Sequence, residues 1–555
     1  MSVDFDIKAL VARKFNEAGV LTDSIDVRTY PSEVIVIVHV SRDFDQALRV
    51  AQDIDGLIED GFVTVKRSKG SKTKKKGKKI TSVHDERVDE LIELLSARSR
   101  TSESQPSLRY VYDADERLKV ARSPRHHLVF GRRGVGKTAL LLEAKRLLER
   151  DGDYTLWVNI HSLRGLRYEE AFLTIAQRLS DLVIGALQGS GSMTGALRMM
   201  ASVREDLESQ LGLASEGKVR LSRVVPKLQQ ALSRFCMEAG SAIYVFLDDV
   251  HYLPPEDVPR LLDCLLGITR DNEVWLKVAG IQHQTRWFVP EPPTGLQTGH
   301  DASIISLDVT LEKPEKAKEF LTSILKGYLE EANVLPLTGF LSSSAVDRLV
   351  LASGGVPRDF LTLCATSLQQ ARQRANARLV GVQDVNNAAG IAASTKLQEL
   401  EDDAAAARGR SAALVSTLHT TREYLLNEQK ITFFKIDLRD KEENPREYGF
   451  IQALADLRML HLINSSLSDP HQAGRRSEVY LLDLSQYSGS RLKHHLRVLD
   501  FEKGHLVLKR TRSSDSTKVG DSPKKLMAIL RGGPIMELAY LRKLCLEPTP
   551  VESNL

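Results

Sequence analysis

The sequence predicts an α/β protein whose largest part is a parallel sheet covered by helices on both faces. Short apolar strands alternate with amphipathic helices from about Tyr110 to Val309, which is the rhythm of repeated βαβ units. A glycine-rich loop joins one of these strands directly to the helix that follows it. The flanking sequence has other patterns: a short α/β stretch precedes the sheet region, and a mainly helical stretch follows it.

The length of 555 residues predicts several domains, since a single domain usually holds about 100–200 residues. Hydrophobic residues make up 42% and charged residues 27%, which excludes a wholly disordered or fibrous chain. The chain has no run of about 18 apolar residues and starts with polar residues, so we expect neither a membrane span nor a secretory signal. Four widely spaced cysteines predict a cytoplasmic location without a zinc site or disulfide framework: Cys236, Cys264, Cys364 and Cys545.

The first 66 residues predict a small α/β domain in the order helix, strand, strand, helix, strand. This order suits a two-layer sandwich, and Ser41 is a candidate N-cap for the second helix. The segment has no GxxG loop of the KH type, so RNA binding is not favoured there. The predicted elements are Asp4–Ala18, Ile25–Arg28, Val34–Val40, Ser41–Glu59 and Phe62–Lys66.

A strongly basic run follows this domain. Between Lys66 and Lys79, nine of fourteen residues are Lys or Arg and none is acidic, although the net charge of the whole chain is only +4. Such a segment buries too little apolar surface to fold, so it predicts a linker. It could bind the phosphates of DNA by counterion release, or it could be a solvated tether. One helix is expected near Glu86–Ala97, before further polar linker.

The sheet region contains the following predicted elements in chain order. The strands are His127–Phe130, Tyr154–Ile160, Ile243–Leu247, Val274–Ile281 and Ser303–Leu307, and the helices are Thr138–Glu149, Glu169–Leu187, Leu221–Glu238 and Val258–Thr269. A stretch rich in glycine and serine, Gly189–Gly195, interrupts this pattern within a longer insertion.

The loop between the first strand and the first helix matches the phosphate-binding pattern GxxxxGK[ST] at every fixed position. Glycines let the backbone curl so that successive N–H groups point at a phosphate, and the helix N-terminus adds positive potential. We expect Lys137 to be a solvent-facing loop residue that reaches the β- and γ-phosphates, and Thr138 to bind Mg²⁺. The candidate nucleotide-binding residues are Gly131, Arg132, Arg133, Gly134, Val135, Gly136, Lys137 and Thr138.

A pair of acids, Asp248-Asp249, ends the buried strand Ile243–Leu247. Asp248 is the candidate metal ligand beside Thr138, and Asp249 is placed to orient or deprotonate the attacking water. The alternative is that both acids only cap the following turn. Because the second acid is aspartate and not the commoner glutamate, its carboxylate reaches about one methylene less far, which predicts slow or conditional hydrolysis.

Together with Ser353-Gly354-Gly355-Val356-Pro357-Arg358, these motifs resemble the AAA+ ATPases. The most similar branch contains the origin-recognition and helicase-loader initiators, their bacterial relatives and the related STAND switch ATPases. The resemblance covers about residues 110–510. It implies a P-loop core with a helical lid, binding of ATP with Mg²⁺, and assembly into a homo-oligomer.

The resemblance also implies roles for individual residues. Gln282 or His283, after the strand Trp275–Ile281, falls where this family has its γ-phosphate sensor. Arg286 matches the finger that completes a neighbouring subunit's site, and a plain surface arginine is the alternative. Arg358 matches the lid arginine that senses the nucleotide, and the alternative is a helix-start arginine after a proline at N1. The predicted catalytic residues are therefore Asp249, Lys137 and Arg286.

The last third resembles the winged-helix domain that follows the lid in initiators. Ser411–Asn427 and Asn444–Leu460 are predicted helices, and His461–Ser465 with Ser477–Leu484 predicts a hairpin. If the second helix reads DNA, the candidate contacts on or near it and on the wing are Arg446, Tyr448, Gln452, Arg458, Arg475 and Arg476. A winged helix that only contacts protein is the alternative.

The predicted division is 1–66, a small α/β domain; 67–107, a basic and polar linker with one helix; 108–310, the ATPase core; 311–400, the lid; 401–510, the winged helix; and 511–555, a polar linker with C-terminal helices. The first functional hypothesis is an ATPase whose nucleotide state controls oligomerisation and DNA binding. The second is a STAND-like switch that signals to a protein partner. A plain NTPase with scaffolding terminal domains is the third.

Overall fold

In the computed structural model, the chain is described in fourteen segments and folds into two compact units. One unit comprises residues 1–78 with 183–197, and the other comprises 79–182 with 198–555. The described residues are 3–22, 24–29, 34–40, 44–55, 61–67, 79–97, 110–111, 116–190, 194–214, 218–406, 411–488, 496–502, 505–510 and 523–545.

In the first unit, three strands and two helices form a small α/β layer pair. β1 (Ser24–Thr29) pairs antiparallel with β2 (Val34–Val40), and β2 pairs parallel with β3 (Gly61–Arg67). α1 (Val3–Glu17) and α2 (Phe44–Asp55) pack their apolar residues on this sheet. The predicted order of elements is confirmed. The proposed cap Ser41 and most of the basic run lie outside the described residues.

The second unit is built around a five-stranded parallel sheet with the strand order β10-β4-β7-β6-β5. Every residue of β4 and β6 is buried, which explains their almost continuous apolar sequence. The predicted α/β class with a P-loop sheet is confirmed. The strands are β4 (His126–Phe130), β5 (Tyr154–Asn159), β6 (Ile243–Asp248), β7 (Val274–Gly280) and β10 (Ala302–Ser306).

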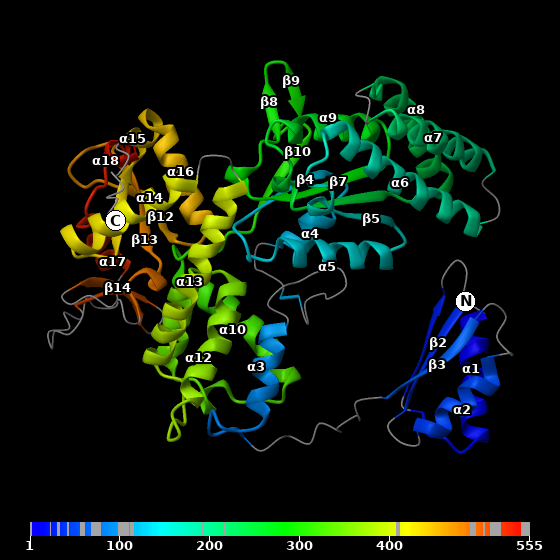
Figure 1. Cartoon of the computed structure of the whole chain (residues 1–555), viewed down its shortest axis with the longest axis horizontal. Helices are drawn as coiled ribbons and strands as arrows, with labels where there is room; N and C mark the ends of the chain where they lie inside the picture. The colour runs from blue at the N-terminus through cyan, green and yellow to red at the C-terminus, as the bar shows by residue number, and fades with distance from the viewer. Residues whose placement is uncertain are drawn as a thin grey trace, which may run out of the picture. The chain divides into compact units, whose positions relative to one another are not determined.

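Helices cover both faces of this sheet (Figure 1). α5 (Lys137–Arg150) packs its apolar residues against β4 and β6, and α9 (Asp257–Thr269) lies on the other side. α7 (Thr194–Gly212) and the hairpin of β8 (Phe288–Pro290) and β9 (Pro293–Gly295) were not predicted. The remaining helices of this region are α4 (Arg117–Arg122), α6 (Tyr168–Ser190) and α8 (Leu221–Ala239), with the short η1 (Ile160–Leu163), η3 (Val250–Tyr252) and η4 (Gln282–Gln284).

The predicted helical lid is present, and it contains one helix more than expected. α3 (Arg87–Ala97) packs against α10 and α12, and its apolar side chains belong to the lid core. The prediction that this helix belongs to a linker is therefore wrong, because Val88, Leu91 and Leu95 are fully buried. The other lid helices are α10 (Pro314–Glu331), η5 (Leu337–Gly339), α11 (Ser343–Ser353), α12 (Pro357–Arg372) and α13 (Val382–Ala406).

Residues 411–488, called the winged-helix region below, run helix, strand, helix, helix, strand, strand. Their sheet has the order β11-β13-β12, in which β12 and β13 form the predicted hairpin. The first strand, β11 (Phe433–Asp437), was not predicted. The elements are α14 (Ser411–Arg422), η6 (Glu423–Glu428), β11, α15 (Leu438–Glu443), α16 (Pro445–Asp456), β12 (Leu460–Ser468), β13 (Arg476–Leu482) and η7 (Leu484–Gln486).

Two further pieces complete the second unit. β14 (Arg497–Glu502) and β15 (His505–Arg510) form an antiparallel ribbon. α17 (Pro523–Arg531) contacts β12, and α18 (Leu538–Cys545) contacts α14 and α16. Across all the segments named above, no helix is long and apolar enough to cross a bilayer.

Candidate nucleotide site

The glycine-rich loop lies at the carboxyl edge of the five-stranded sheet, between β4 and α5. Gly134 has φ +82° and Gly136 has φ +106°, left-handed values that residues with a side chain rarely adopt. α5 begins immediately after the loop, so the positive end of its dipole faces the same space. The loop therefore has the backbone curl and the helix N-terminus that a phosphate site requires.

Lys137 is the first residue of α5, and its side chain is buried rather than solvent-facing as we expected. Its Nζ donates hydrogen bonds to the carbonyl oxygens of Gly131 at 2.8 Å and Arg132 at 3.2 Å. Burial lowers the pKa of Lys137, and the carboxylates of Asp249 and Asp248 act in the opposite direction. The ammonium group thus lies inside the loop that would surround the phosphates.

Thr138 and Asp248 form the candidate metal site. Thr138 Oγ1 donates to Asp248 Oδ2 at 2.7 Å, and the other carboxylate oxygen, Oδ1, is buried without a hydrogen-bond partner among the described residues. Burial, and then the neighbouring Asp249, raises the pKa of Asp248 to about 7. A buried carboxylate oxygen without a donor fits Mg²⁺, which prefers oxygen ligands and whose charge favours the ionised carboxylate.

Asp249 lies one residue beyond the metal-site carboxylate, where the chain leaves β6. Its backbone is left-handed (φ +61°, ψ +42°), and its side chain is 32% exposed. The following η3 brings His251 close, with its Nδ1 3.9 Å from Asp249 Oδ1. A carboxylate at this place, beside the metal ligand and open to solvent, can orient or deprotonate a water.

The lid meets the loop at the start of α12. The Arg358 N–H donates to the carbonyl of Gly134 at 3.3 Å, and a Cβ on Gly134 would lie 2.7 Å from the Cβ of Arg358. The close approach of lid and loop thus depends on glycine at position 134. The sequence-predicted lid arginine is therefore brought to the phosphate loop, in the first turn of a helix that begins with Pro357.

Arg132 holds the other side of the loop to the lid. Its Nε donates to Asp308 Oδ1 at 3.1 Å, and its Nη2 donates to the carbonyls of Val309 at 3.0 Å and Gly354 at 3.1 Å. The Arg132 side chain, a predicted nucleotide contact, is thus engaged with protein atoms. Asp308 was not predicted as part of the site, because it follows β10 without any motif around it.

The candidate sensors and the candidate finger lie just beyond β7 at the same edge of the sheet. Gln282 and His283 belong to η4, and both are exposed. Arg286 is also exposed, two residues after η4. Because β7 lies between β4 and β6, these residues follow a strand that is flanked by the loop strand and the acid-pair strand. An exposed guanidinium there is accessible to a second molecule.

The family model of the AAA ATPase domain matches residues 115–276, which include the loop, the acid pair and the start of β7. This segment is similar to AAA ATPase domains. The predicted resemblance to the AAA+ ATPases is confirmed, and the match covers the part of the chain in which sequence motifs and observed geometry agree.

Three solved structures are similar to longer parts of the chain. The Orc1 protein of Aeropyrum pernix in complex with DNA is 16% identical, with 67% of this chain and 90% of that chain covered and a TM-score of 0.33. Cdc6p of Pyrobaculum aerophilum is 13% identical, covering 68% and 92%, with a TM-score of 0.32. AMPPCP-bound DnaA of Aquifex aeolicus is 11% identical, covering 63% and 96%, with a TM-score of 0.27. No curated protein matches the sequence.

Outside the AAA ATPase domain, a buried ionic network joins the lid to the winged-helix region. Arg458 Nη1 lies 2.6 Å from Asp359 Oδ1, and Lys396 Nζ lies 3.3 Å from Asp359 Oδ2. Asp483 Oδ2 accepts from Lys396 Nζ at 3.0 Å and lies 2.7 Å from His461 Nε2. All five side chains are less than 10% exposed. Although burial acts in the opposite direction, Arg458 and Lys396 lower the pKa of Asp359, which keeps it ionised.

This network changes the interpretation of the predicted DNA contacts. Arg458 is buried within it, and Tyr448 is buried and donates from its hydroxyl to Glu478 Oε2 at 2.8 Å. Neither side chain lies on a surface that DNA can reach. The reason is that α16 packs against α14, β12, α18 and η4. Arg475 pairs with Asp437, whereas Arg446 and Arg476 are exposed and Gln452 is half-buried.

Asp456, near the C-terminal end of α16, lies within electrostatic range of the phosphate loop. The residue is 6% exposed, and its Oδ2 is buried without a hydrogen-bond partner in the described part of the chain. Burial, and then the charge of Asp308, raises the pKa of Asp456 to about 7. The cations that act on it in the opposite direction belong to the phosphate loop, and they are Arg132, Lys137 and Arg133. Asp456 is the one acid in the stretch 451–457, and no motif in the sequence relates it to the phosphate loop.

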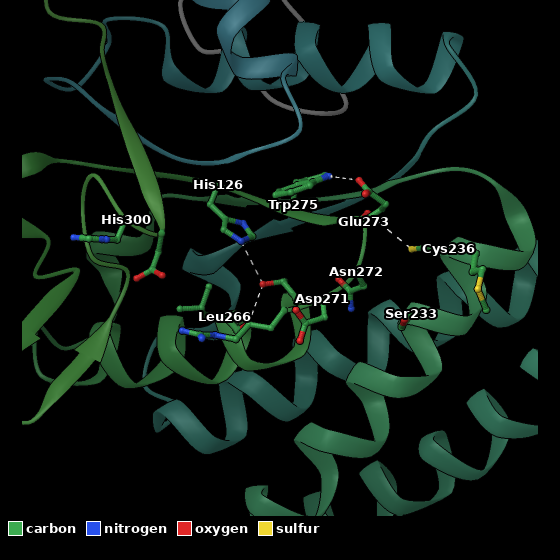
Figure 2. Close-up of a pocket in the computed structure, with 13 residues that line it drawn as sticks. His126, Ser233, Cys236, Leu266, Asp271, Asn272, Glu273, Trp275 and His300 are labelled. Carbon is green, nitrogen blue, oxygen red and sulfur yellow. Dashed lines mark hydrogen bonds between the residues drawn. The ribbon is translucent and has the colours of Figure 1, made fainter.

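A separate cavity of about 700 Å³ lies at the amino ends of β4 and β7, at the opposite edge of the sheet from the phosphate loop (Figure 2). The backbone N–H of Leu276 donates to His126 Nδ1 at 3.0 Å, and His126 Nε2 lies 3.4 Å from Thr269 Oγ1. Trp275 Nε1 donates to Glu273 Oε2 at 3.3 Å. The residues that line this cavity include neither the glycine-rich loop nor the acid pair, so the loop stays the candidate nucleotide site.

Proposed function

We propose that this protein binds ATP with Mg²⁺ at the carboxyl edge of its parallel sheet and hydrolyses it slowly. The observation that carries the proposal is the pairing of Thr138 with Asp248, beside a loop that encloses the Lys137 ammonium group. Asp248 Oδ1 accepts no hydrogen bond from any residue that the structure describes. The lysine would bind the β- and γ-phosphates, and the Thr138–Asp248 pair would hold the metal. The residues proposed to surround the nucleotide are Gly131, Arg132, Arg133, Gly134, Val135, Gly136, Lys137, Thr138, Gln282 and Arg358.

The proposed slow rate of ATP hydrolysis follows from the second residue of the acid pair, Asp249. Asp249 is the proposed base or orienting group for the attacking water, and it is about one methylene shorter than a glutamate would be. Arg286 is proposed as the finger that a neighbouring subunit would receive, because it is exposed beyond η4. Hydrolysis would then depend on self-assembly, since the guanidinium group has to come from another copy.

We further propose that nucleotide state controls oligomerisation and DNA binding through the winged-helix region. Three contacts support such a coupling. Arg358 bonds to Gly134, the adjacent Asp359 pairs with Arg458, and α16 packs on η4, which carries the candidate sensor. A γ-phosphate that moves the loop or η4 therefore acts on side chains already tied to α16. The basic run and the exposed Arg446 and Arg476 would supply phosphate contacts on DNA.

The test is mass photometry of the chain with ATP, ADP or no nucleotide, each with and without duplex DNA. We expect the 61.8 kDa monomer without nucleotide, and larger, DNA-dependent species with ATP. Deleting residues 69–79 should weaken DNA binding and flatten its salt dependence. A mass that is the same in all six conditions would remove DNA binding and assembly from the proposal, while ATP binding would be judged separately by calorimetry.

One observation favours the second hypothesis, a nucleotide switch that signals to a protein partner. Much of the surface of α16 is occupied by α14, α18 and η4, so in this conformation the helix contacts protein. If ATP changes the protease sensitivity of the winged-helix region while DNA leaves the mass unchanged, the switch is the better description. Apart from the predicted linker 67–107, whose helix α3 belongs to the lid, the predicted domain boundaries and the cytoplasmic location stay part of this proposal.

A further inference from the structure

The turn after β6 brings a histidine beside the proposed catalytic carboxylate. β6 ends at Asp248, Asp249 takes a left-handed conformation, and η3 continues from Val250 to Tyr252. Such a backbone is uncommon for a residue other than glycine, and the surrounding structure must offset its strain. This turn places His251 Nδ1 3.9 Å from Asp249 Oδ1.

The imidazole of His251 is enclosed and lacks the partners that buried polar groups normally have. Its side chain is 4% exposed, and neither ring nitrogen has a hydrogen-bond partner among the residues that the structure describes. Most buried side-chain polar atoms have such a partner, because a buried polar atom without one loses its hydrogen bonds to water and gains none in return. The two ring nitrogens therefore keep hydrogen-bonding capacity that no described residue uses.

The charges around the ring relate it to the phosphate site. Burial, followed by the charges of Lys137 and Arg133, lowers the pKa of His251 to about 3. Both cations belong to the phosphate loop. The ring is thus neutral at pH 7, with one nitrogen that donates and one that accepts. Tyr252 lies against it with ring centroids 4.6 Å apart, which restricts its orientation.

Resting on the proposed ATPase function, we propose that His251 is a positioning residue that holds the attacking water together with Asp249. The separation of 3.9 Å is too long for a direct hydrogen bond, but a water with two bonds of about 2.8 Å spans it. Asp249 accepts the proton of this water as its oxygen bonds to the γ-phosphorus. The bond from that phosphorus to the bridging oxygen breaks, and its electron pair leaves with ADP. His251 keeps its own proton and supplies one hydrogen bond.

This role offsets the short side chain of Asp249. A carboxylate that reaches less far can still present a water at the correct place when a second group holds that water from another side. The loss of His251 should therefore affect the chemical step and leave nucleotide binding intact.

The experiment compares His251→Gln and His251→Ala with the matched control His161→Gln, an exposed histidine whose ring also contacts Tyr252. Three quantities are measured: affinity for a non-hydrolysable ATP analogue, single-turnover hydrolysis, and trapping of ADP with aluminium fluoride, which mimics the transition state. We expect His251→Ala to hydrolyse about 10- to 100-fold more slowly and to trap ADP correspondingly less. Its affinity for the analogue should stay within about twofold, His251→Gln should retain part of the rate, and His161→Gln should match the wild type.

The outcomes separate this inference from the proposed function. Wild-type protein that neither binds nor hydrolyses ATP overturns both. Normal hydrolysis and trapping in both His251 variants overturn the inference alone. A parallel loss of analogue affinity and hydrolysis assigns the ring a structural role and also overturns it. His251→Gln keeps the test decisive if the alanine variant fails to fold.

Discussion

The phosphate loop and the winged-helix region differ in how they use their charged residues. At the loop, Lys137, Thr138 and Asp248 gather at one sheet edge, and one carboxylate oxygen of Asp248 has no hydrogen-bond partner within the described segments. In the winged-helix region, Arg458 and Tyr448 pair with protein acids inside the structure. The first arrangement leaves ligand positions open, and the second fills them.

The phosphate loop and the winged-helix region differ because their functional side chains are held in place in different ways. The loop residues are fixed by the local backbone, in which two glycines have positive φ. These glycines can be recognised in the sequence from their fixed spacing. The environment of charged residues on α16, and of Arg458 just after it, depends on which other elements pack against that helix. A buried arginine needs a carboxylate near it, and Asp359 is 99 residues away in the sequence. A basic residue on a candidate recognition helix is therefore a weaker sign of function than a glycine-rich loop.

The largest expected effect concerns ATP binding by the phosphate loop. Lys137→Ala should reduce ATP affinity at least about 100-fold, because it removes a charged donor to the phosphates. The fold should survive, since the variant also removes a buried charge that is costly to desolvate. Titration calorimetry measures the affinity and thermal unfolding measures the fold. Arg146→Ala, an exposed position on the same helix, is the control. Unchanged affinity in Lys137→Ala would contradict the assignment of the loop.

The second prediction tests whether Arg458 is structural. Arg458→Met leaves Asp359 with Lys396 alone, and should destabilise the contact of lid and winged-helix region by about 3 kcal/mol. Hydrogen exchange should accelerate in α12 and β12, with little change in β4. If exchange is unaltered and only DNA affinity falls, Arg458 is a DNA contact after all, and the distinction between the two regions fails.

The smallest expected effect tests whether Asp456, in the winged-helix region, influences ATP binding at the phosphate loop. Asp456→Asn removes a carboxylate that lies within reach of the loop cations, so the phosphates of ATP should meet less repulsion. We expect about fivefold tighter ATP binding and unchanged affinity in the control Glu443→Gln, which alters an exposed carboxylate on α15. Calorimetry of the two variants at equal ionic strength decides this. Equal affinities would mean that Asp456 does not act on the nucleotide.

Much of the fold could be predicted from the sequence, because periodicity and apolar runs mark the five parallel strands and the lid helices. α3 was assigned to a linker because its neighbours are polar or basic, and only packing against α10 and α12 reveals it as lid. β11 was missed because Phe433–Asp437 is a short strand that lies next to helix-forming sequence. A local sequence pattern does not show which distant segments pack against such an element and stabilise it.

The candidate site divides in the same way. Lys137, Thr138, Asp248 and Arg358 were identified from motifs with fixed spacing, and the structure brings them to one edge. Asp308, Asp456 and His251 lie outside such motifs, and their importance depends on burial and on charges that come from distant parts of the chain. Distance in sequence hides these relationships, whereas burial and unpaired atoms reveal them.

The most direct test of the account is isothermal titration of ATP into the folded protein, with Mg²⁺ and again with EDTA. We predict saturable heat with Mg²⁺ at about one nucleotide per chain, and weaker binding with EDTA because the Thr138–Asp248 pair then holds no metal. The absence of binding heat in both titrations, with protein that unfolds cooperatively on heating, would contradict the account.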